Sequence, residues 1–405
     1  MDPEKLRTER ELQRHTQLSL ATAAKVSERT IARLENGESA STDVQSRIAT
    51  VLGKPLTFFM PTVSPPTEAE CLQMVRTLRT AGYDALMAAR RAVYGYAKPA
   101  RVVQNPRKIT DKDVAADPTE VVDQVTGDAI RHALARAASV KGHPLASGYV
   151  FVEEECGVMD IPGPGDVAPR WVIVVDPADD SAAMSLGLAG TVLLSAYLKG
   201  YGWVAAVACD FVRMRLFSRV TGKAAHALQL KFSSSDTLPF PGDMPPPADE
   251  DPSGAIVDIG SSGRKSVRGA TVCIYLGKAD RIQSAAAGGA TLLAKANFKS
   301  IHSYGGSRGP LLVAEGSLDA AIEYTKGFKR LDLIPGIFIA EGAGCTVLLP
   351  GRNGRLQADF GRDELMEALF ETSIGREKLI EEGRQRFIVA ASSALADQIA
   401  NQLNW

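Results

Sequence analysis

Cysteine, histidine and aromatic residues are scarce in this chain of 405 residues, and its formal net charge is only -1. The five cysteines are scattered and never form a Cys-x-x-Cys pair, which argues against a structural zinc site or a disulfide framework and fits a reducing cytoplasm. The five histidines do not cluster, so any metal should be a hard cation held by carboxylates. Because the charge is balanced, a nucleic-acid surface must be a local patch.

Long uninterrupted apolar runs are also missing. The chain does not start with an apolar segment behind a basic stretch, so we expect no signal peptide. The most apolar stretch, residues 186–208, is interrupted by several glycines and by Lys199, which favours buried sheet over a membrane span. We therefore expect a cytoplasmic protein with no membrane partner.

What the chain does have is enough length for two or three domains, with 45% apolar and 23% charged residues. Residues 1–60 predict an all-α domain of short helices separated by polar turns. Residues 61–67 contain several prolines and predict a linker. Residues 68–405 predict a larger domain, in which the proline-rich acidic segment 238–252 is expected to be an exposed loop between subdomains.

Helical and strand-like patterns alternate within residues 68–405. Apolar residues spaced along one face predict a helix over residues 68–94 and another over 125–138. Short apolar runs predict strands at residues 149–152, 171–175, 203–207, 255–259, 271–275 and 336–340. This interleaving favours a layered α/β or α+β fold.

Residues 16–37 have the pattern of two short helices joined by a tight turn. Each helix has a small apolar inner face, formed by Leu20, Ala21 and Ala24 in the first and by Ile31 and Leu34 in the second. Ser27 is a good N-cap for the second helix, and Asn36-Gly37 is a typical helix end.

This segment resembles the helix-turn-helix of Cro and the lambda-type repressors (the XRE family). The resemblance rests on the residues Gln17, Ala21, Val26-Ser27, Ile31 and Glu35-Asn36-Gly37. Lys25 stands where the family usually has a turn glycine, and a lysine adopts the required backbone conformation only at some cost. The alternative is a helical bundle that only mediates assembly.

The resemblance implies that double-stranded DNA is a partner. Glu28, Arg29 and Thr30 would face base edges, while Gln17 and Arg33 would help to hold phosphates. Since domains of this class usually read two half-sites, it also implies a homodimer.

Four groups of carboxylates follow one another in the larger domain. They lie in residues 123–128, 153–155 and 176–181, and at Asp332. The second and third groups each follow an apolar strand-like run, which places them at strand ends. Mg²⁺ prefers such oxygen ligands, and two ions about 3.5–4 Å apart can activate a water and neutralise a leaving oxygen.

These groups, in this order, resemble the motifs of the inositol monophosphatase and fructose-bisphosphatase superfamily over roughly residues 68–400. The resemblance implies an inositol monophosphatase-like fold with Mg²⁺ as cofactor. One ion would be held by Glu154, Asp176 and the carbonyl of Ala178, and the other by Asp176, Asp179 and Asp332. Gly305-Gly306-Ser307-Arg308 resembles the family's glycine-serine turn on the substrate side.

The same resemblance implies catalytic roles. Asp123 and Ser181 would orient the attacking water beside the metal ligand Glu154, and backbone N–H groups near Asp180 and Ser181 would meet the phosphate. Two departures stand out. Asp180 replaces the family glycine, and its carboxylate repels a bound phosphate unless it points away. Leu331 replaces the family tryptophan before the last aspartate.

Two functions follow from the combination of domains. The first is a DNA-binding transcriptional regulator whose phosphatase-fold domain binds a phosphorylated metabolite. The alternative is a Mg²⁺-dependent phosphomonoesterase of sugar, inositol or nucleotide phosphates with an appended DNA-binding domain. Asp180 favours the first function and the retained carboxylates favour the second. A purely structural role is disfavoured, because clustered carboxylates are costly without a cation.

Overall fold

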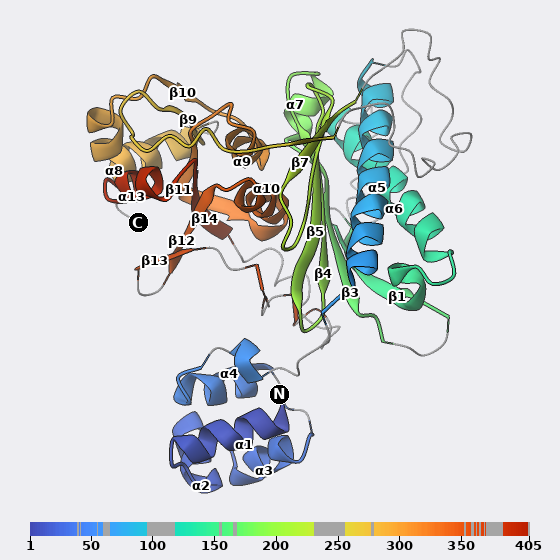
Figure 1. The fold of residues 1–405 in the computed structure, drawn as a ribbon, viewed down its shortest axis with the longest axis vertical. Helices are drawn as coiled ribbons and strands as arrows, with labels where there is room; N and C mark the ends of the chain where they lie inside the picture. The colour runs from blue at the N-terminus through green and yellow to red at the C-terminus, as the bar shows by residue number, and fades with distance from the viewer. Residues whose placement is uncertain are drawn as a thin grey trace, which may run out of the picture. The chain divides into compact units, whose positions relative to one another are not determined.

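The computed structural model describes residues 1–38, 40, 42–54, 56–59, 65–94, 118–153, 156–164, 168–230, 256–276, 279–351, 354–357, 360–361, 363, 366–367, 369 and 384–403. They belong to two compact units (Figure 1). The first unit consists of Met1–Pro66, Leu198–Trp203 and Phe360–Arg376, and the second of Thr67–Tyr197, Val204–Asp359 and Glu377–Trp405. Within the described ranges, no helix is both long and apolar enough to span a bilayer.

Short helices fill the N-terminal part of the first unit. They are α1 (Pro3–Leu12), α2 (Gln17–Ala24), α3 (Glu28–Glu35), α4 (Thr42–Val51) and the 3-10 helix η1 (Leu56–Phe59). Their apolar faces meet in one core, which includes Leu6, Leu20, Ile31, Leu34, Ile48 and Phe59. The predicted all-α character of this segment is therefore confirmed.

The turn between α2 and α3 has the geometry that the sequence predicts. Lys25 ends α2 in the left-handed conformation (φ 54°, ψ 46°), which costs a non-glycine residue about 1–2 kcal/mol. Ser27 caps α3 by accepting the backbone N–H of Thr30 at 3.1 Å. Asn36 is the C-cap of α3, and Gly37 follows with φ +86°.

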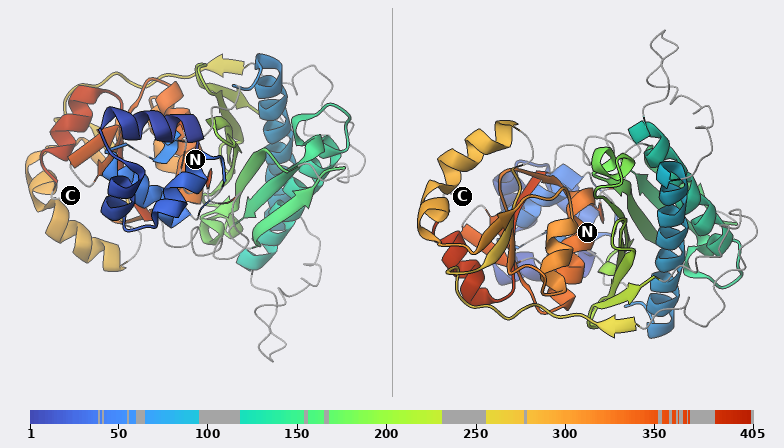
Figure 2. Two further views of the ribbon diagram at one scale, coloured as in Figure 1. Left: turned by 90° about the horizontal axis from the view of Figure 1, so that it is seen from below. Right: turned by 90° about the horizontal axis from the view of Figure 1, so that it is seen from above.

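The second unit begins with two long helices that cover one face of an eight-stranded sheet. The helices α5 (Glu68–Tyr94) and α6 (Pro118–Ala138) lie side by side, α5 against β6 and α6 against β3 (Figure 2). The strand order is β2-β1-β3-β4-β5-β6-β7-β8. These strands are β1 (Gly148–Glu153), β2 (Gly157–Pro162), β3 (Trp171–Asp179), β4 (Thr191–Leu198), β5 (Gly202–Asp210), β6 (Arg215–Val220), β7 (His226–Gln229) and β8 (Ile256–Asp258).

A second sheet has six strands in the order β10-β9-β11-β14-β12-β13. They are β9 (Thr271–Ile274), β10 (Ser300–His302), β11 (Ala320–Lys329), β12 (Thr346–Gly351), β13 (Gly354–Gln357) and β14 (Arg384–Ala390). The helices of this part are α8 (Ala279–Lys295), α9 (Arg308–Ala314), α10 (Arg330–Gly342) and α13 (Ser393–Ala400). Because α10 packs against strands of both sheets, the unit consists of alternating helical and sheet layers (Figure 1).

The layered α/β fold is thus confirmed, and so is the helix over residues 68–94. The second helix begins earlier than predicted, at Pro118. The strand predicted at residues 336–340 is wrong, since these residues lie in α10. A short, fully buried apolar run has no polar alternation, so its pattern does not separate a strand from a buried helix. The predicted loop 238–252 lies outside the described residues.

Candidate functional site

The carboxyl end of β3 contains two of the predicted ligands. Asp176 is 5% exposed and Asp179 is 8% exposed, because β3 lies inside the sheet between β1 and β4. The Oδ1 atom of Asp176 accepts the backbone N–H of Ala178 at 3.2 Å, and Ala178 is buried as well. Carboxylates are rarely buried to this extent without compensating partners.

Ser307 connects Asp179 to the start of α10. Its backbone N–H donates to Asp179 Oδ2 at 2.8 Å, and its hydroxyl donates to the backbone carbonyl of Asp332 in the first turn of α10. The hydroxyl of Thr191 donates to the same Asp179 oxygen at 2.9 Å. Asp179 and the backbone of Asp332, far apart in sequence, are therefore held at one place.

The turn before Ser307 fits tightly around two carboxylates. A Cβ atom on Gly306 would overlap the Asp179 carboxylate, and one on Gly305 would overlap the Asp180 carboxylate. Gly306 also has φ +44°, and its carbonyl accepts the Tyr275 hydroxyl at 2.9 Å. Glycine is thus required at this turn for steric reasons.

Asp180 occupies a backbone position that favours glycine. Its φ of 64° and ψ of 46° are left-handed, and it precedes the short helix α7 (Ser181–Ser185) without a side-chain capping bond. The half-buried Asp180 side chain lies against Gly305, beside the contact between Asp179 and Gly306. The carboxylates of Asp179 and Asp180 thus pack against adjacent glycines of the same turn.

At the end of β1, an arginine of α6 engages the neighbouring acidic groups. Arg131 forms ion pairs with Asp128 at 2.7 Å and with the buried Glu153, and Gly127 leaves the space that the Glu153 carboxylate occupies. Burial raises the pKa of Glu153, although the charge of Arg131 opposes this. Sequence reasoning did not foresee this network, because nothing in the spacing pairs Arg131 with a strand end.

For Asp123 and Ser181, the structure shows which elements contain them. Asp123 lies in the second turn of α6, and α6 packs against both β3 and α7, which begins with Ser181. Glu154 lies outside the described residues.

The donor chemistry at this site fits a hard divalent cation, since the buried groups at the end of β3 are carboxylate and carbonyl oxygens. The described residues, from which Glu154 is missing, do not include three acidic, histidine or cysteine side chains close enough together to hold a metal ion. The structure thus brings together Asp179, Asp180 and the backbone of Asp332, with Asp176 on the same strand.

In the first unit, the predicted DNA contacts lie mainly on α3. Glu28, Arg29 and Arg33 are exposed, and the Arg33 guanidinium lies 2.6 Å from the exposed Glu38. Thr30 is half-buried, with its hydroxyl 2.8 Å from that of Ser27.

The half-buried Gln17 side chain makes a hydrogen bond within the first unit. Its amide donates to the buried carboxylate of Glu35 at 2.7 Å. This hydrogen bond gives Gln17 a structural role that its position in the sequence motif did not reveal.

The sequence model described as helix-turn-helix matches residues 6–59, and that of the inositol monophosphatase family matches residues 75–401. The second match covers more than half of the chain. The chain belongs to the inositol monophosphatase family. Both predicted family resemblances are confirmed. A search of curated proteins found no match.

The chain is similar to several solved structures. Mycobacterium tuberculosis SuhB is 20% identical, with a TM-score of 0.48 over 81% of this chain and 92% of that one. A protein from Pyrococcus horikoshii, described as similar to inositol-1 monophosphatase, is 17% identical, with a TM-score of 0.50 over 82% of this chain and 100% of that one. The inositol monophosphatase of Anabaena (Nostoc) sp. PCC 7120 is 13% identical, with a TM-score of 0.49 over 82% of this chain and 95% of that one.

Proposed function

We propose that this protein is a DNA-binding transcriptional regulator whose phosphatase-fold unit binds a phosphorylated metabolite. The observation that supports the proposal is the position of Asp180, which follows the end of β3 and whose carboxylate packs against Gly305, next to the glycine that meets Asp179. Binding of a phosphorylated ligand is stabilised by contacts to all parts of that ligand. Hydrolysis additionally requires that the charge on the phosphoryl group is compensated in the transition state. An added carboxylate at this place therefore lowers turnover more than it lowers binding.

In this regulator, the helix-turn-helix segment would bind the operator, and the ligand would change its affinity for DNA. A ligand changes operator affinity only if it binds the DNA-competent and incompetent states with different affinities. A homodimer with paired recognition helices suits such a switch, because two half-sites must be engaged together.

Mg²⁺ is the cofactor that this donor set favours. It would be held by the oxygen donors of Glu154, Asp176, Ala178, Asp179 and Asp332. When bound, it would neutralise phosphate charge and polarise the phosphoryl oxygen. Asp123 and Ser181 would orient a water, and the backbone N–H groups near Asp180 and Ser181 would meet the phosphate.

A phosphomonoesterase with an appended DNA-binding domain is the second candidate function. The burial of Asp176 and Asp179 favours it, since both acids are kept where a cation would offset their charge. The decisive experiment measures phosphate release from sugar, inositol and nucleotide phosphates with Mg²⁺, for the wild type and for Asp176→Asn. Operator affinity is measured with each compound in parallel.

The regulator hypothesis expects little release and an operator affinity that depends on one class of compound. Release that disappears in Asp176→Asn, together with an operator affinity that no compound changes, would establish the enzyme instead.

Substitution of Asp180 tests the charge argument. Asp180→Asn removes the charge but keeps the shape, so affinity for inorganic phosphate with Mg²⁺ should rise about tenfold. Asp180→Gly should raise it similarly and also stabilise the unit by about 1 kcal/mol, because the left-handed backbone is then unstrained. Calorimetric titration and urea unfolding measure the two effects. An unchanged phosphate affinity in Asp180→Asn would contradict the proposed role of Asp180.

Substitutions on α3 test DNA recognition. Arg29→Ala should lose about 1–3 kcal/mol of discrimination between operator and unrelated DNA, as expected for a bidentate base contact. Arg33→Ala, its matched control on the same helix, should weaken binding evenly across sequences and flatten the salt dependence. Fluorescence anisotropy at several salt concentrations separates these outcomes. Operator discrimination that survives in Arg29→Ala would show that Arg29 does not read bases.

A further inference from the structure

A basic loop, residues 260–270, precedes β9 in the second unit. It contains three cationic side chains, Arg264, Lys265 and Arg268, and no acidic residue. All three cationic residues are exposed. In a chain whose formal net charge is only -1, such a local surplus of positive charge indicates a surface for a negatively charged partner.

Hydrogen bonds from α13 and its N-cap hold the basic loop in place. The hydroxyl of Ser392, the N-cap, donates to the Arg264 carbonyl at 2.6 Å, and the Gln398 amide donates to the Lys265 carbonyl at 2.7 Å. Val267 is buried in a core that also contains apolar residues of α13 and of the second sheet. The cationic side chains therefore extend from a fixed backbone, so little backbone entropy is lost when the loop binds a partner.

The carboxylate of Asp319 lies against the basic loop, but its charge is compensated within the protein. It accepts the Ser262 hydroxyl at 2.6 Å and the Thr271 backbone N–H at 2.8 Å. It also forms an ion pair with Arg264 at 3.0 Å, and it is 8% exposed. Because Arg264 and Asp319 compensate each other, the surplus charge comes from the other two cations of the loop.

Lys265 and Arg268 are these two cations. Across the ranges that the structure describes, neither side chain makes a hydrogen bond or an ion pair with another protein group. The exposed Lys299 lies next to the end of the loop, because its backbone N–H donates to the Ala270 carbonyl at 2.8 Å. The described residues provide no anionic partner for the Lys299 side chain either. Asp397, the exposed acid of α13, reduces this positive surplus without cancelling it.

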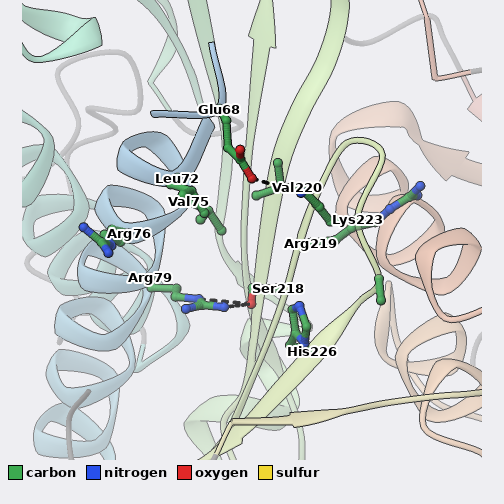
Figure 3. Close-up of a pocket in the computed structure, with 11 residues that line it drawn as sticks. Glu68, Leu72, Val75, Arg76, Arg79, Ser218, Arg219, Val220, Lys223 and His226 are labelled. Carbon is green, nitrogen blue, oxygen red and sulfur yellow. Dashed lines mark hydrogen bonds and ion pairs between the residues drawn. The ribbon is translucent and has the colours of Figure 1, made fainter. Parts of the chain in front are cut away.

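Two other exposed cations of the second unit provide a contrast. Lys223 borders a cavity between α5 and β6, where its Nζ lies 2.9 Å from a carboxylate oxygen of Glu68 (Figure 3). Arg136 of α6 lies 2.7 Å from the Asp84 carboxylate of α5. The charge of each cation is therefore compensated by a neighbouring carboxylate. The cations of the basic loop differ from them because they are exposed and unpaired.

We propose that the basic loop and Lys299 form a second DNA-binding surface, which contacts phosphates of the duplex without reading its bases. The proposal rests on the DNA binding proposed above for the helix-turn-helix segment. A duplex presents closely spaced phosphates, and unpaired lysines and arginines bind them with release of counterions. Once α3 is bound to its operator, a second contact by the same chain is intramolecular, so even weak phosphate contacts raise the overall affinity.

The test is the salt dependence of duplex binding by the full chain, measured by fluorescence anisotropy between about 50 and 200 mM salt. The loop variant is Lys265→Ala/Arg268→Ala. In this variant the slope of log affinity against log salt should become shallower by about 2, and affinity at the lowest salt should fall about tenfold or more for operator and unrelated DNA alike. Both side chains are exposed, so the loop variant should fold, which thermal unfolding verifies.

The matched control is Lys223→Ala/Arg136→Ala. It removes the same two positive charges from the chain, but from cations that are paired with carboxylates. Its slope should therefore stay close to that of the wild type. An equally shallow slope in the control and in the loop variant would overturn the proposal, because the net charge of the chain would then explain the effect.

Three further results would also overturn the proposal. If the loop variant keeps the slope of the wild type while Arg29→Ala loses operator discrimination, the second surface fails and the helix-turn-helix contact stands. If the wild type binds no duplex at all, the proposed DNA binding fails together with the second surface. If the loop variant keeps its DNA slope but loses binding to phosphatidylglycerol vesicles that the wild type binds, the basic loop contacts a lipid surface instead.

Discussion

Gly306→Ala should cost about 3 kcal/mol of folding stability and abolish phosphate binding at the end of β3. The added methyl group would overlap the Asp179 carboxylate, which lies directly against Gly306. The turn cannot easily move away, because Ser307 N–H is bound to Asp179 and the Tyr275 hydroxyl is bound to the Gly306 carbonyl. Either Asp179 rotates away from its hydrogen bonds or the turn shifts and loses them.

Backbone strain alone would also destabilise this variant, so Gly222→Ala is the matched control. Gly222 has φ +71°, and a Cβ atom there would meet no other atom within 4 Å. This control should cost only about 1–2 kcal/mol, the strain of a left-handed alanine. Urea unfolding and phosphate titration measure both variants. If Gly306→Ala proves no more harmful than Gly222→Ala, the close packing of Asp179 on the turn is refuted.

The sequence predicted elements well where one side of an element is buried and the other is not. The helix α5 shows this, since its apolar face is regular over its whole length and the predicted bounds match. The helix α10 shows the opposite case. Its residues from Leu331 to Ala340 are nearly all buried, so no polar face reveals the helical period.

The sequence predicted where the acidic groups lie relative to the strands, but it did not predict their contacts. The apolar run at residues 171–175 placed Asp176 and Asp179 at a strand end, and β3 does end at Asp179. The hydrogen bond from Ser307 to Asp179 joins residues 128 positions apart. Such a pairing depends on how the two sheets pack, and no local pattern encodes it.

The departure at Asp180 shows what the structure adds to a motif. The sequence identified a missing glycine, and the backbone explains the preference, because this position is left-handed. The sequence does not show in which direction the Asp180 carboxylate points, whereas the structure shows that it packs against Gly305. Strain and charge therefore act at the same residue, and the substitutions of Asp180 separate them.

Glu35→Ala should unfold the helix-turn-helix segment and abolish operator binding. The carboxylate is 4% exposed and accepts hydrogen bonds from Arg10 Nε at 2.6 Å, Arg10 Nη2 at 3.1 Å and the Gln17 amide at 2.7 Å. Removing it leaves the buried Arg10 guanidinium without this partner, which costs about 3–5 kcal/mol. That is comparable to the whole stability of a domain of roughly 60 residues.

The pKa of Glu35 gives the same prediction a pH dependence. Burial alone would raise the pKa of Glu35, but the hydrogen bonds and charge of Arg10, together with the Gln17 amide, outweigh burial and lower the pKa below its usual range. A carboxyl with a lowered folded-state pKa stabilises the fold above its unfolded pKa and loses this effect as the pH falls through the folded value. The helix-turn-helix segment should therefore lose stability as the pH drops below the ordinary glutamate pKa of about 4.3.

Calorimetric unfolding of the full chain measures the loss of stability, with Glu38→Ala as its control, and operator titration of Glu35→Ala measures the loss of DNA binding. Glu38 forms an ion pair with Arg33 in which both side chains are about half exposed, so its removal should cost no more than about 1 kcal/mol. The two carboxylates lie three residues apart, and each binds an arginine, but only the Glu35 pair is buried. Equal losses in the two variants would mean that burial of the Arg10–Glu35 pair does not hold the DNA-binding helices together.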